Sequence, residues 1–255
     1  MSFLYRIAAG QPALAKIGQK SREPVDAASL AVFRIALGLL IVYDAIFKGL
    51  HKFSSNNHAL FRIPYEGFEW VPSGGAYAGI LAGFWLGSAI FVTLGLLYRP
   101  AMILATGLTI FAFLQAQEYY LNHYYLLILV CILMCMVPAN RAYALDCLWG
   151  RTRKQPPTVT RMHMWLLKGQ TEIVLLYAGL VKLNSDWLQL EPLRSWLLQR
   201  KDDHFFGWVW EYDWVIAAGN YGVIGLHILG APLLLWKRTR LPVFLLYCAF
   251  HISNH

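Results

Sequence analysis

The fold is decided by the stretch Ser29-Leu-Ala-Val-Phe-Arg-Ile-Ala-Leu-Gly-Leu-Leu-Ile-Val-Tyr-Asp-Ala-Ile-Phe47, a continuous apolar run long enough to cross a bilayer as a helix. Its only charged side chains are those of Arg34 and Asp44. Further apolar runs follow at Tyr77–Leu97, Ala101–Leu114, His123–Val137, Trp165–Lys182, Val215–Trp236 and Leu241–His255. Polar gaps separate these runs, so the sequence predicts an all-α polytopic membrane bundle of about seven transmembrane helices.

The composition also indicates that the chain folds in a lipid bilayer. Hydrophobic residues make up 58% of the chain and charged residues 14%, and the mean hydropathy is +0.45. A soluble domain with this balance would be covered in apolar patches. The net charge of +8 could suggest nucleic acid, but the basic residues do not form one patch with interleaved aromatics. We therefore expect a lipid bilayer, and no nucleic acid, as the partner of this surface.

One membrane domain is expected from this pattern, preceded by a short N-terminal segment. Residues 1–26 are predicted to be a cytoplasmic N-terminal segment, and residues 27–255 a transmembrane domain. Because the chain stops after a short last run, we expect this domain to be truncated at its C-terminus. The four cysteines lie mostly in apolar runs without a metal-like spacing, so they are read as packing residues and no metal is expected.

The distribution of Lys and Arg gives the orientation, because cytoplasmic loops carry an excess of these residues. Fourteen fall on one side of the predicted spans and six on the other, and the N-terminus lies on the richer side. The N-terminus is therefore predicted to be cytoplasmic. The segment Glu191–Arg200 places its apolar and basic residues on opposite helical faces, which predicts an amphipathic helix lying in the membrane interface. We expect this helix to cover a lateral entrance from the lipid.

Ionisable groups inside the spans are costly, so each is a functional candidate. They are Arg34, Asp44, His123, Glu172, Lys182, His227 and His251. Arg34 and Glu172 both lie toward the cytoplasmic side, where a structural ion pair explains them. His227 is alone in a glycine-rich helix and is expected to be a hydrogen-bonded packing residue.

The remaining candidates converge toward the non-cytoplasmic half. Asp44 ends the first span, Asn122 and His123 begin the fourth, and Lys182 ends the fifth, while His251 lies deeper on the seventh. Two simpler explanations stay open at this point, namely that Lys182 extends to the interface and that Asn122 caps its helix. Burial of the lysine would favour the neutral amine, which is a base or nucleophile. A charge on the nearby Asp186 would instead favour the ammonium form.

Five stretches stand out together along the chain. They are Asp26-Ala-Ala-Ser-Leu-Ala-Val-Phe-Arg-Ile with Gly38 and Asp44; Gly95-Leu-Leu-Tyr-Arg99; Asn122-His123-Tyr-Tyr-Leu; Lys168-Gly-Gln-x-x-Ile-Val with Ala178-Gly-Leu-Val-Lys182-Leu-x-x-Asp186-Trp187; and Phe250-His251-x-x-Asn254. In this order they resemble the vitamin K-dependent gamma-carboxylases and their horizontally transferred transmembrane-domain (HTTM) relatives. The fourth stretch is the most specific.

The resemblance implies a chemistry at the non-cytoplasmic face. A reduced vitamin K-type quinone (hydroquinone) would react with O2, and the strong base so formed would remove a proton from glutamate before CO2 adds. Lys182 matches the base that deprotonates the hydroquinone, and Asn122 and His123 match the pair that supports carboxylation. A quinone-binding or supporting role is implied for His251, Asn254, Asp44 and Asp186. The implied partners are a lipophilic quinone and a Glu-containing peptide or small acid.

The chain departs from the family in two places. Val181 precedes Lys182 where the family has a second lysine, and the sequence stops at His255 before the family's remaining helices and soluble domain. Carboxylation of large protein substrates is therefore not expected. Two other functions remain open: a quinone redox or epoxidising membrane protein without carboxylation, and a non-enzymatic membrane protein whose polar cluster is a proton or ion path.

Overall fold

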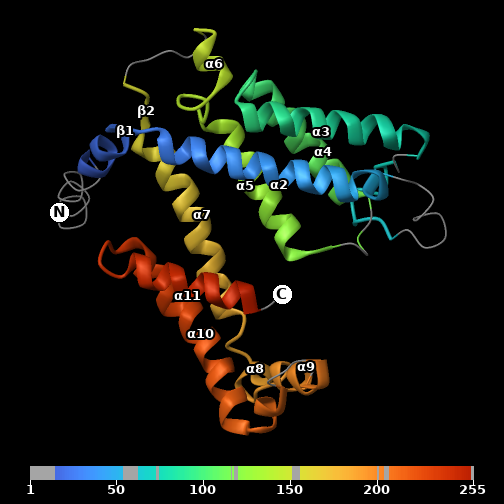
Figure 1. Ribbon diagram of the computed structural model, residues 1–255, viewed down its shortest axis with the longest axis vertical. Helices are drawn as coiled ribbons and strands as arrows, with labels where there is room; N and C mark the ends of the chain where they lie inside the picture. Colours follow the sequence, from blue (N-terminus) through green and yellow to red (C-terminus); the bar gives the residue numbers. More distant parts are fainter. Residues whose placement is uncertain are drawn as a thin grey trace, which may run out of the picture. The chain divides into compact units, whose positions relative to one another are not determined.

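The chain folds into helices that form two compact units. The computed structural model describes residues 15–53, 63–72, 75–115, 117, 120–150, 156–199, 201–203 and 207–253. The first unit comprises residues 1–167 and the second residues 168–255. Figure 1 shows their elements in sequence colours. Asn254, one of the predicted supporting residues, lies outside the described residues.

The first unit is a helical layer built on the opening apolar run. Its helices are α2 Ala28–Phe53, α3 Ala78–Leu94, α4 Tyr98–Leu114, α5 Asn122–Met136 and the short α6 Leu145–Leu148. Helix α3 packs against both α2 and α4, and α5 packs against α4 (Figure 1). Trp85 of α3 is fully buried in this core and donates from its indole nitrogen to Thr109 of α4 at 3.1 Å. Consecutive helices thus pair in space, as short connections dictate.

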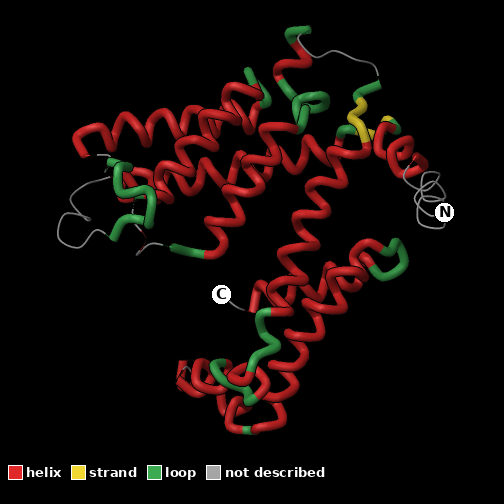
Figure 2. The backbone as a smooth tube through the Cα atoms, turned by 180° about the vertical axis from the view of Figure 1, so that it is seen from behind, coloured by secondary structure: helices red, strands yellow, loops and turns green. Residues whose placement is uncertain are grey.

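A small two-stranded ladder was not predicted from the sequence. Strand β1 Pro24–Asp26 pairs antiparallel with β2 Thr158–Thr160, which leads directly into α7 Arg161–Leu180. An ion pair of 2.6 Å between Arg161 and Glu23 lies beside the ladder. Figure 2 shows these strands in yellow among the helices. The ladder joins the entry to α2 to the start of α7, so residues 23–26 belong structurally with the membrane domain.

Arg34 is the only charged side chain with 0% exposure among the described residues. Both of its Nη groups donate to carbonyl oxygens, whereas its buried Nε has no hydrogen-bond partner among the described residues. Its Nη1 donates to the carbonyls of Ala139 at 2.9 Å and Ala142 at 3.3 Å. Its Nη2 donates to those of Thr93 at 3.4 Å and Tyr143 at 2.5 Å. These carbonyls come from the end of α3 and from the segment after α5. One guanidinium therefore holds α2 to two other parts of the unit.

This arrangement differs from the expected ion pair between Arg34 and Glu172. The guanidinium finds its hydrogen-bond partners inside the first unit, whereas Glu172 belongs to the second unit. The physical reason is that a buried cation is satisfied equally well by a ring of carbonyl dipoles, which sequence does not mark. Gly95, with φ +64°, closes the site, since a Cβ there would lie 2.7 Å from Nη1 of Arg34.

A second buried charge orders the turn between α3 and α4. The carboxylate of Asp146 accepts from the backbone N–H groups of Leu97 at 2.9 Å and Tyr98 at 3.1 Å. It also accepts from the side-chain amide of Asn140 at 2.8 Å. A carboxylate at a helix N-terminus satisfies orphan donors and matches the helix dipole. Asp146 thus fixes the start of α4.

The second unit continues from α7 and is built around a helical pair. Its further elements are α8 Ser185–Leu188, α9 Leu193–Gln199, η4 Lys201–Asp203, η5 Gly207–Glu211, α10 Asp213–Leu235 and α11 Arg240–Ser253. Helix α11 packs against α10 (Figure 2). Gly179 near the end of α7 lets that helix approach α10 closely, because a Cβ there would lie 2.7 Å from Ile228 and 2.9 Å from His227. The predicted amphipathic segment Glu191–Arg200 contains α9, and Arg194 of α9 pairs with Asp213 at 2.8 Å.

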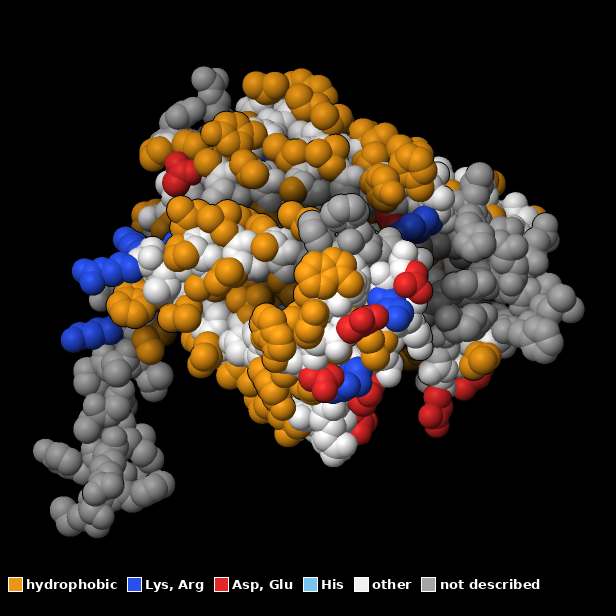
Figure 3. All heavy atoms as spheres, turned by 60° about the horizontal axis from the view of Figure 1, so that its bottom comes forward, with side chains coloured by type: hydrophobic (Ala, Val, Ile, Leu, Met, Phe, Trp, Pro, Cys, Tyr) orange, Lys and Arg blue, Asp and Glu red, His pale blue; other side chains and the backbone are white. Residues whose placement is uncertain are grey.

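The predicted spans all coincide with helices, and the membrane character is clear from their length and surface. Three helices are long and apolar enough to cross a membrane, at Ala28–Gly49, Gly75–Leu94 and Asp213–Leu235. Shorter apolar helices occur at Tyr98–Leu114, Asn122–Met136 and Arg240–Ile252. Hydrophobic side chains spread over much of the face drawn in Figure 3, as a lipid-facing surface requires. The total of seven spans stays a prediction.

Replacing Arg34 by Met should destabilise the first unit. The variant leaves buried carbonyl oxygens without a donor, and each such group costs about 1–3 kcal/mol. We expect the thermal unfolding midpoint of the purified protein in detergent to fall clearly. Arg99→Met, at an exposed position four residues after Gly95, is the matched control and should change the midpoint little. An unchanged midpoint in Arg34→Met would contradict the role given to this cation.

Candidate functional site

Lys182 lies just beyond the end of α7 and is half-buried. Its Nζ donates to the carbonyl oxygen of Ala178 at 2.8 Å and lies 5.1 Å from the centre of a ring of Trp187. The last carbonyls of a helix lack intrahelical partners, so a lysine that reaches back satisfies one of them. The aromatic face offers a second favourable contact for the ammonium group. The lysine therefore has a defined position in the second unit.

Asp186 follows Lys182 by four residues, and the sequence left open whether its charge would act on the lysine. Asp186 is exposed, and its side chain accepts from the hydroxyl of Ser185 at 3.2 Å. No ion pair between Asp186 and Lys182 occurs among residues 156–199. The cationic form of the lysine is supported by a carbonyl and a ring rather than by a neighbouring anion.

A histidine and aromatic cluster lies on α10 and α11 of the same unit. His227 is buried, and its Nδ1 bonds to the carbonyl oxygen of Val223 at 2.7 Å, so Nδ1 carries the proton and Nε2 holds the lone pair. The ring of His227 meets Tyr247 edge-on at 5.7 Å and Phe250 at 5.2 Å. His251 stacks on Tyr247 at 6.4 Å. The predicted packing role of His227 is confirmed.

Two of the predicted site residues, Lys182 and His251, belong to this unit, the first just beyond α7 and the second on α11. The backbone of α7 comes close to His227 three residues before Lys182, because a Cβ on Gly179 would lie 2.9 Å from the Cβ of His227. The unit thus holds a lysine amine beside the ring of Trp187 and, on α10 and α11, an imidazole among aromatic rings.

Asn220 is a residue that sequence reasoning missed. It is fully buried on α10, and its side-chain N–H donates to the backbone carbonyl of Trp187 at 2.7 Å. Its Oδ1 is buried without a hydrogen-bond partner among the described residues. Beside it, Tyr221 donates from its hydroxyl to the carbonyl of Leu188 at 2.9 Å. These two contacts fasten α8 to α10 and so hold Trp187 next to Lys182. The available signal was an amide side chain within an apolar run.

In the first unit, Asp44 lies near the start of α5 in space. Its carboxylate is buried, accepts from the hydroxyl of Tyr124 at 2.5 Å and pairs with Lys48 at 3.1 Å. Asn122 and His123 form the exposed first residues of α5. The structure thus brings three of the predicted residues to one end of this unit. No side chain caps α5, whose N-cap residue is Leu121, so the capping explanation for Asn122 is not observed.

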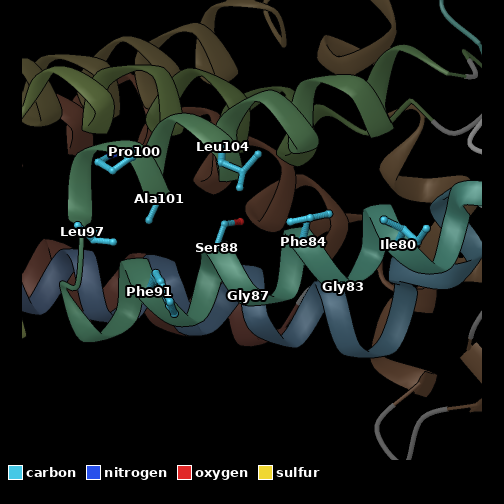
Figure 4. A pocket seen from close by; sticks show the side chains of 10 residues that line it. All are labelled: Ile80, Gly83, Phe84, Gly87, Ser88, Phe91, Leu97, Pro100, Ala101 and Leu104. Carbon is cyan, nitrogen blue, oxygen red and sulfur yellow. The ribbon is translucent and has the colours of Figure 1, made fainter.

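The apolar groove of the first unit lies elsewhere. It has a volume of about 580 Å³ between α3 and α4. Figure 4 shows its lining residues, which are Ile80, Gly83, Phe84, Gly87, Ser88, Phe91, Leu97, Pro100, Ala101 and Leu104. The hydroxyl of Ser88 is already bonded to the carbonyl of Trp85 at 2.8 Å. The groove contains none of the predicted catalytic residues and has the character of a surface for lipid chains.

Comparison with known families gives one match over nearly the whole chain. A family model described as the HTTM domain matches residues 22–255. The chain belongs to the HTTM family. The family is that of domains associated with vitamin K-dependent carboxylases, so the resemblance found in the sequence is confirmed at this level. No solved structure matches the chain.

The HTTM match treats both units as one domain. It begins at Arg22, ahead of β1, and continues through α11. The residues that the family resemblance selected are divided between the units: Asp44, Asn122 and His123 lie in the first, and Lys182, Asp186 and His251 in the second. Asn122 and His123 lie at the start of α5 and Lys182 just beyond the end of α7, whereas Asp44 lies within α2.

Replacing Asn220 by Ala should loosen α8. The variant removes the hydrogen bond to the carbonyl of Trp187, which contributes about 1 kcal/mol. Amide hydrogen exchange of residues 185–190 should then be about fivefold faster. Gly219→Ala is the control, because residue 219 is exposed and a Cβ there meets only Leu193 at 3.8 Å. Identical exchange in both variants would show that Asn220 does not hold α8.

Proposed function

We propose that this HTTM protein is a gamma-carboxylase-like membrane enzyme. It would couple the oxygenation of a reduced vitamin K-type quinone to carboxylation of a glutamate or another acidic substrate, with Lys182 as the base. The observation that carries the proposal is the position of this lysine. It is half-buried beside the ring of Trp187, with no anion paired to it in the described residues around it, in a chain of the carboxylase-associated family.

The residues around Lys182 fit an aromatic diol. A hydroquinone needs an apolar, aromatic surrounding and a base at its hydroxyl, and the second unit supplies Trp187 and the amine of Lys182. When bound, the hydroquinone supplies the reducing equivalents and, with O2, the strong base that the reaction requires. The backbone carbonyl of Ala178 holds the lysine at one of its hydrogens and leaves others to face a ligand.

The proposed role of Lys182 is a single proton transfer at Nζ. The ammonium group first releases a proton, and the neutral amine then takes the proton of a phenolic hydroxyl. A base with an ion-paired carboxylate would hold its own proton more tightly, so the absence of such a pair in residues 156–199 suits the role. His251, on the face of Tyr247, is assigned a supporting polar role in the same unit.

Asn122 and His123 are assigned to the later carboxylation. Both side chains are exposed at the start of α5, where an amide and an imidazole offer hydrogen-bond donors to a carboxylate or to CO2. The first turn of the helix adds positive dipole character at the same place. Asp44 supports them from α2, and Asp186 is assigned a supporting role near the lysine. This assignment rests on the family motif and on the exposure of both side chains.

The proposed location follows from the charge distribution. Fourteen Lys and Arg residues on the N-terminal side of the spans and six on the other support a multi-pass protein with a cytoplasmic N-terminus. Asn122, His123 and Lys182 would then face the non-cytoplasmic side. A lipophilic quinone would enter from the bilayer, with α9 at the interface as a gate.

One alternative has its own support. Lys182 and His251 belong to the second unit, whereas Asn122 and His123 belong to the first. A quinone-epoxidising protein that performs no carboxylation would need Lys182 and not Asn122 or His123. Epoxide formed at the same rate with and without CO2, and without carboxylated product, would favour this second function.

The central experiment measures epoxide formed from a reduced naphthoquinone and O2 by purified protein in lipid nanodiscs. Lys182→Ala should lower the rate about a hundredfold or more, the usual contribution of a positioned general base. Lys168→Ala, an exposed lysine on the same helix, is the matched control and should retain the wild-type rate. The proposal fails if wild-type protein with normal thermal stability forms no epoxide, or if Lys182→Ala forms it at the wild-type rate.

A further inference from the structure

Three side chains, those of Asp44, Lys48 and Tyr124, contact one another at one end of the first unit. The hydroxyl of Tyr124 donates to Oδ1 of Asp44 at 2.5 Å, and Nζ of Lys48 lies 3.1 Å from the same oxygen. The lysine also donates to the tyrosine hydroxyl at 3.2 Å. Asp44 and Lys48 are one turn apart on α2, whereas Tyr124 is on α5. The contact therefore joins two helices that do not follow each other in the chain.

The charged groups of this contact differ in burial. The side chain of Asp44 is 7% exposed and that of Lys48 is 50% exposed. A buried carboxylate is costly unless it is paired and hydrogen-bonded, and here it has both a cation and a hydroxyl. The tyrosine hydroxyl is the only member contributed by α5. Its removal would separate that helix from the buried charge.

The first turn of α5 begins without a side-chain cap among the described residues. The N–H groups of Tyr124 and Tyr125 both bond to the carbonyl of Leu121, at 2.9 and 3.2 Å. The side chains of Asn122 and His123 are exposed on this first turn. The ring of His123 lies 5.7 Å from that of Tyr124. An uncapped first turn frays readily, so a side-chain anchor within it determines where its neighbours lie.

We propose that Tyr124 is a positioning residue for Asn122 and His123, anchored by Asp44 and Lys48, and that this anchor couples carboxylation to epoxidation. The inference rests on the proposed function and deepens it. Tyr124 need not touch a substrate; it acts through the turn that it fixes. Lys182 belongs to the second unit and takes no part in this contact. Loss of the anchor should therefore lower carboxylation more than epoxidation.

The test compares two products in one reaction. Wild type, Tyr124→Phe and Tyr125→Phe are assayed in nanodiscs with a reduced naphthoquinone, O2, radiolabelled bicarbonate and a short glutamate-containing peptide. Tyr125 is the matched control, because it is exposed on the same turn and its ring contacts Phe113 at 6.5 Å. The ratio of carboxylated product to epoxide should fall about fivefold in Tyr124→Phe, the effect of one lost hydrogen bond, and stay at the wild-type value in Tyr125→Phe.

Two variants of Asp44 separate the hydrogen bond from the charge. Asp44→Asn keeps an oxygen acceptor for the tyrosine hydroxyl, whereas Asp44→Ala removes it. The ratio should be closer to wild type in Asp44→Asn than in Asp44→Ala. Equal loss of both products in Tyr124→Phe, or equal ratios in the two Asp44 variants, would overturn the positioning role.

A measurement that needs no activity decides the same point. Amide hydrogen exchange of residues 121–126 should be faster in Tyr124→Phe than in wild type, and unchanged in Tyr125→Phe. Equal exchange in all three proteins would overturn the inference whatever the assay shows. If wild type formed no epoxide, the proposed function would fail, while the exchange rates would still show whether Tyr124 anchors the turn.

Discussion

The first unit depends on the burial of one cation. Arg34 is placed in an otherwise apolar helix and is 0% exposed, so its guanidinium must be satisfied within the protein. Carbonyl oxygens at the end of α3 and after α5 accept from its two Nη groups, at Thr93 and Ala139 among others. Since a guanidinium presents donors in a fixed planar fork, the carbonyls must lie where the fork points. A residue on α2 therefore helps to position the last turn of α3 and the segment that follows α5.

Two of the charged residues of α2, Arg34 and Asp44, contact the two ends of α5. Arg34 bonds to the carbonyl of Ala139, just beyond the C-terminal end of α5, and Asp44 accepts from Tyr124, in its first turn. Between these points the helix packs against α4. The polar contacts therefore hold the two ends of α5, and packing against α4 holds the helix between them. These contacts therefore also determine where the exposed Asn122 and His123 lie. In the second unit, Asn220 plays a comparable part by holding α8, which carries the ring beside Lys182.

The sequence predicted the helices well and the polar contacts less well. Hydropathy marks a span directly, so every predicted run coincides with a helix. Strands of three residues, such as β1, have no pattern that could reveal them. The carbonyl partners of Arg34 carry no signature either, because every residue has a carbonyl. Tyr124 was visible in the Asn-His motif, but its meaning depends on the distance to Asp44, which only a structure provides.

If Asn122, His123 and Lys182 serve one reaction, they must open to the same, non-cytoplasmic side of the membrane. Single-cysteine variants test this in a protein whose own cysteines, Cys131, Cys135, Cys147 and Cys248, are replaced by Ala. Labelling of intact cells with a membrane-impermeant maleimide should modify Asn122→Cys and Ser185→Cys. The exposed controls Gly18→Cys and Arg238→Cys should react only after permeabilisation. Labelling of Asn122→Cys and Ser185→Cys from opposite sides would contradict a shared reaction.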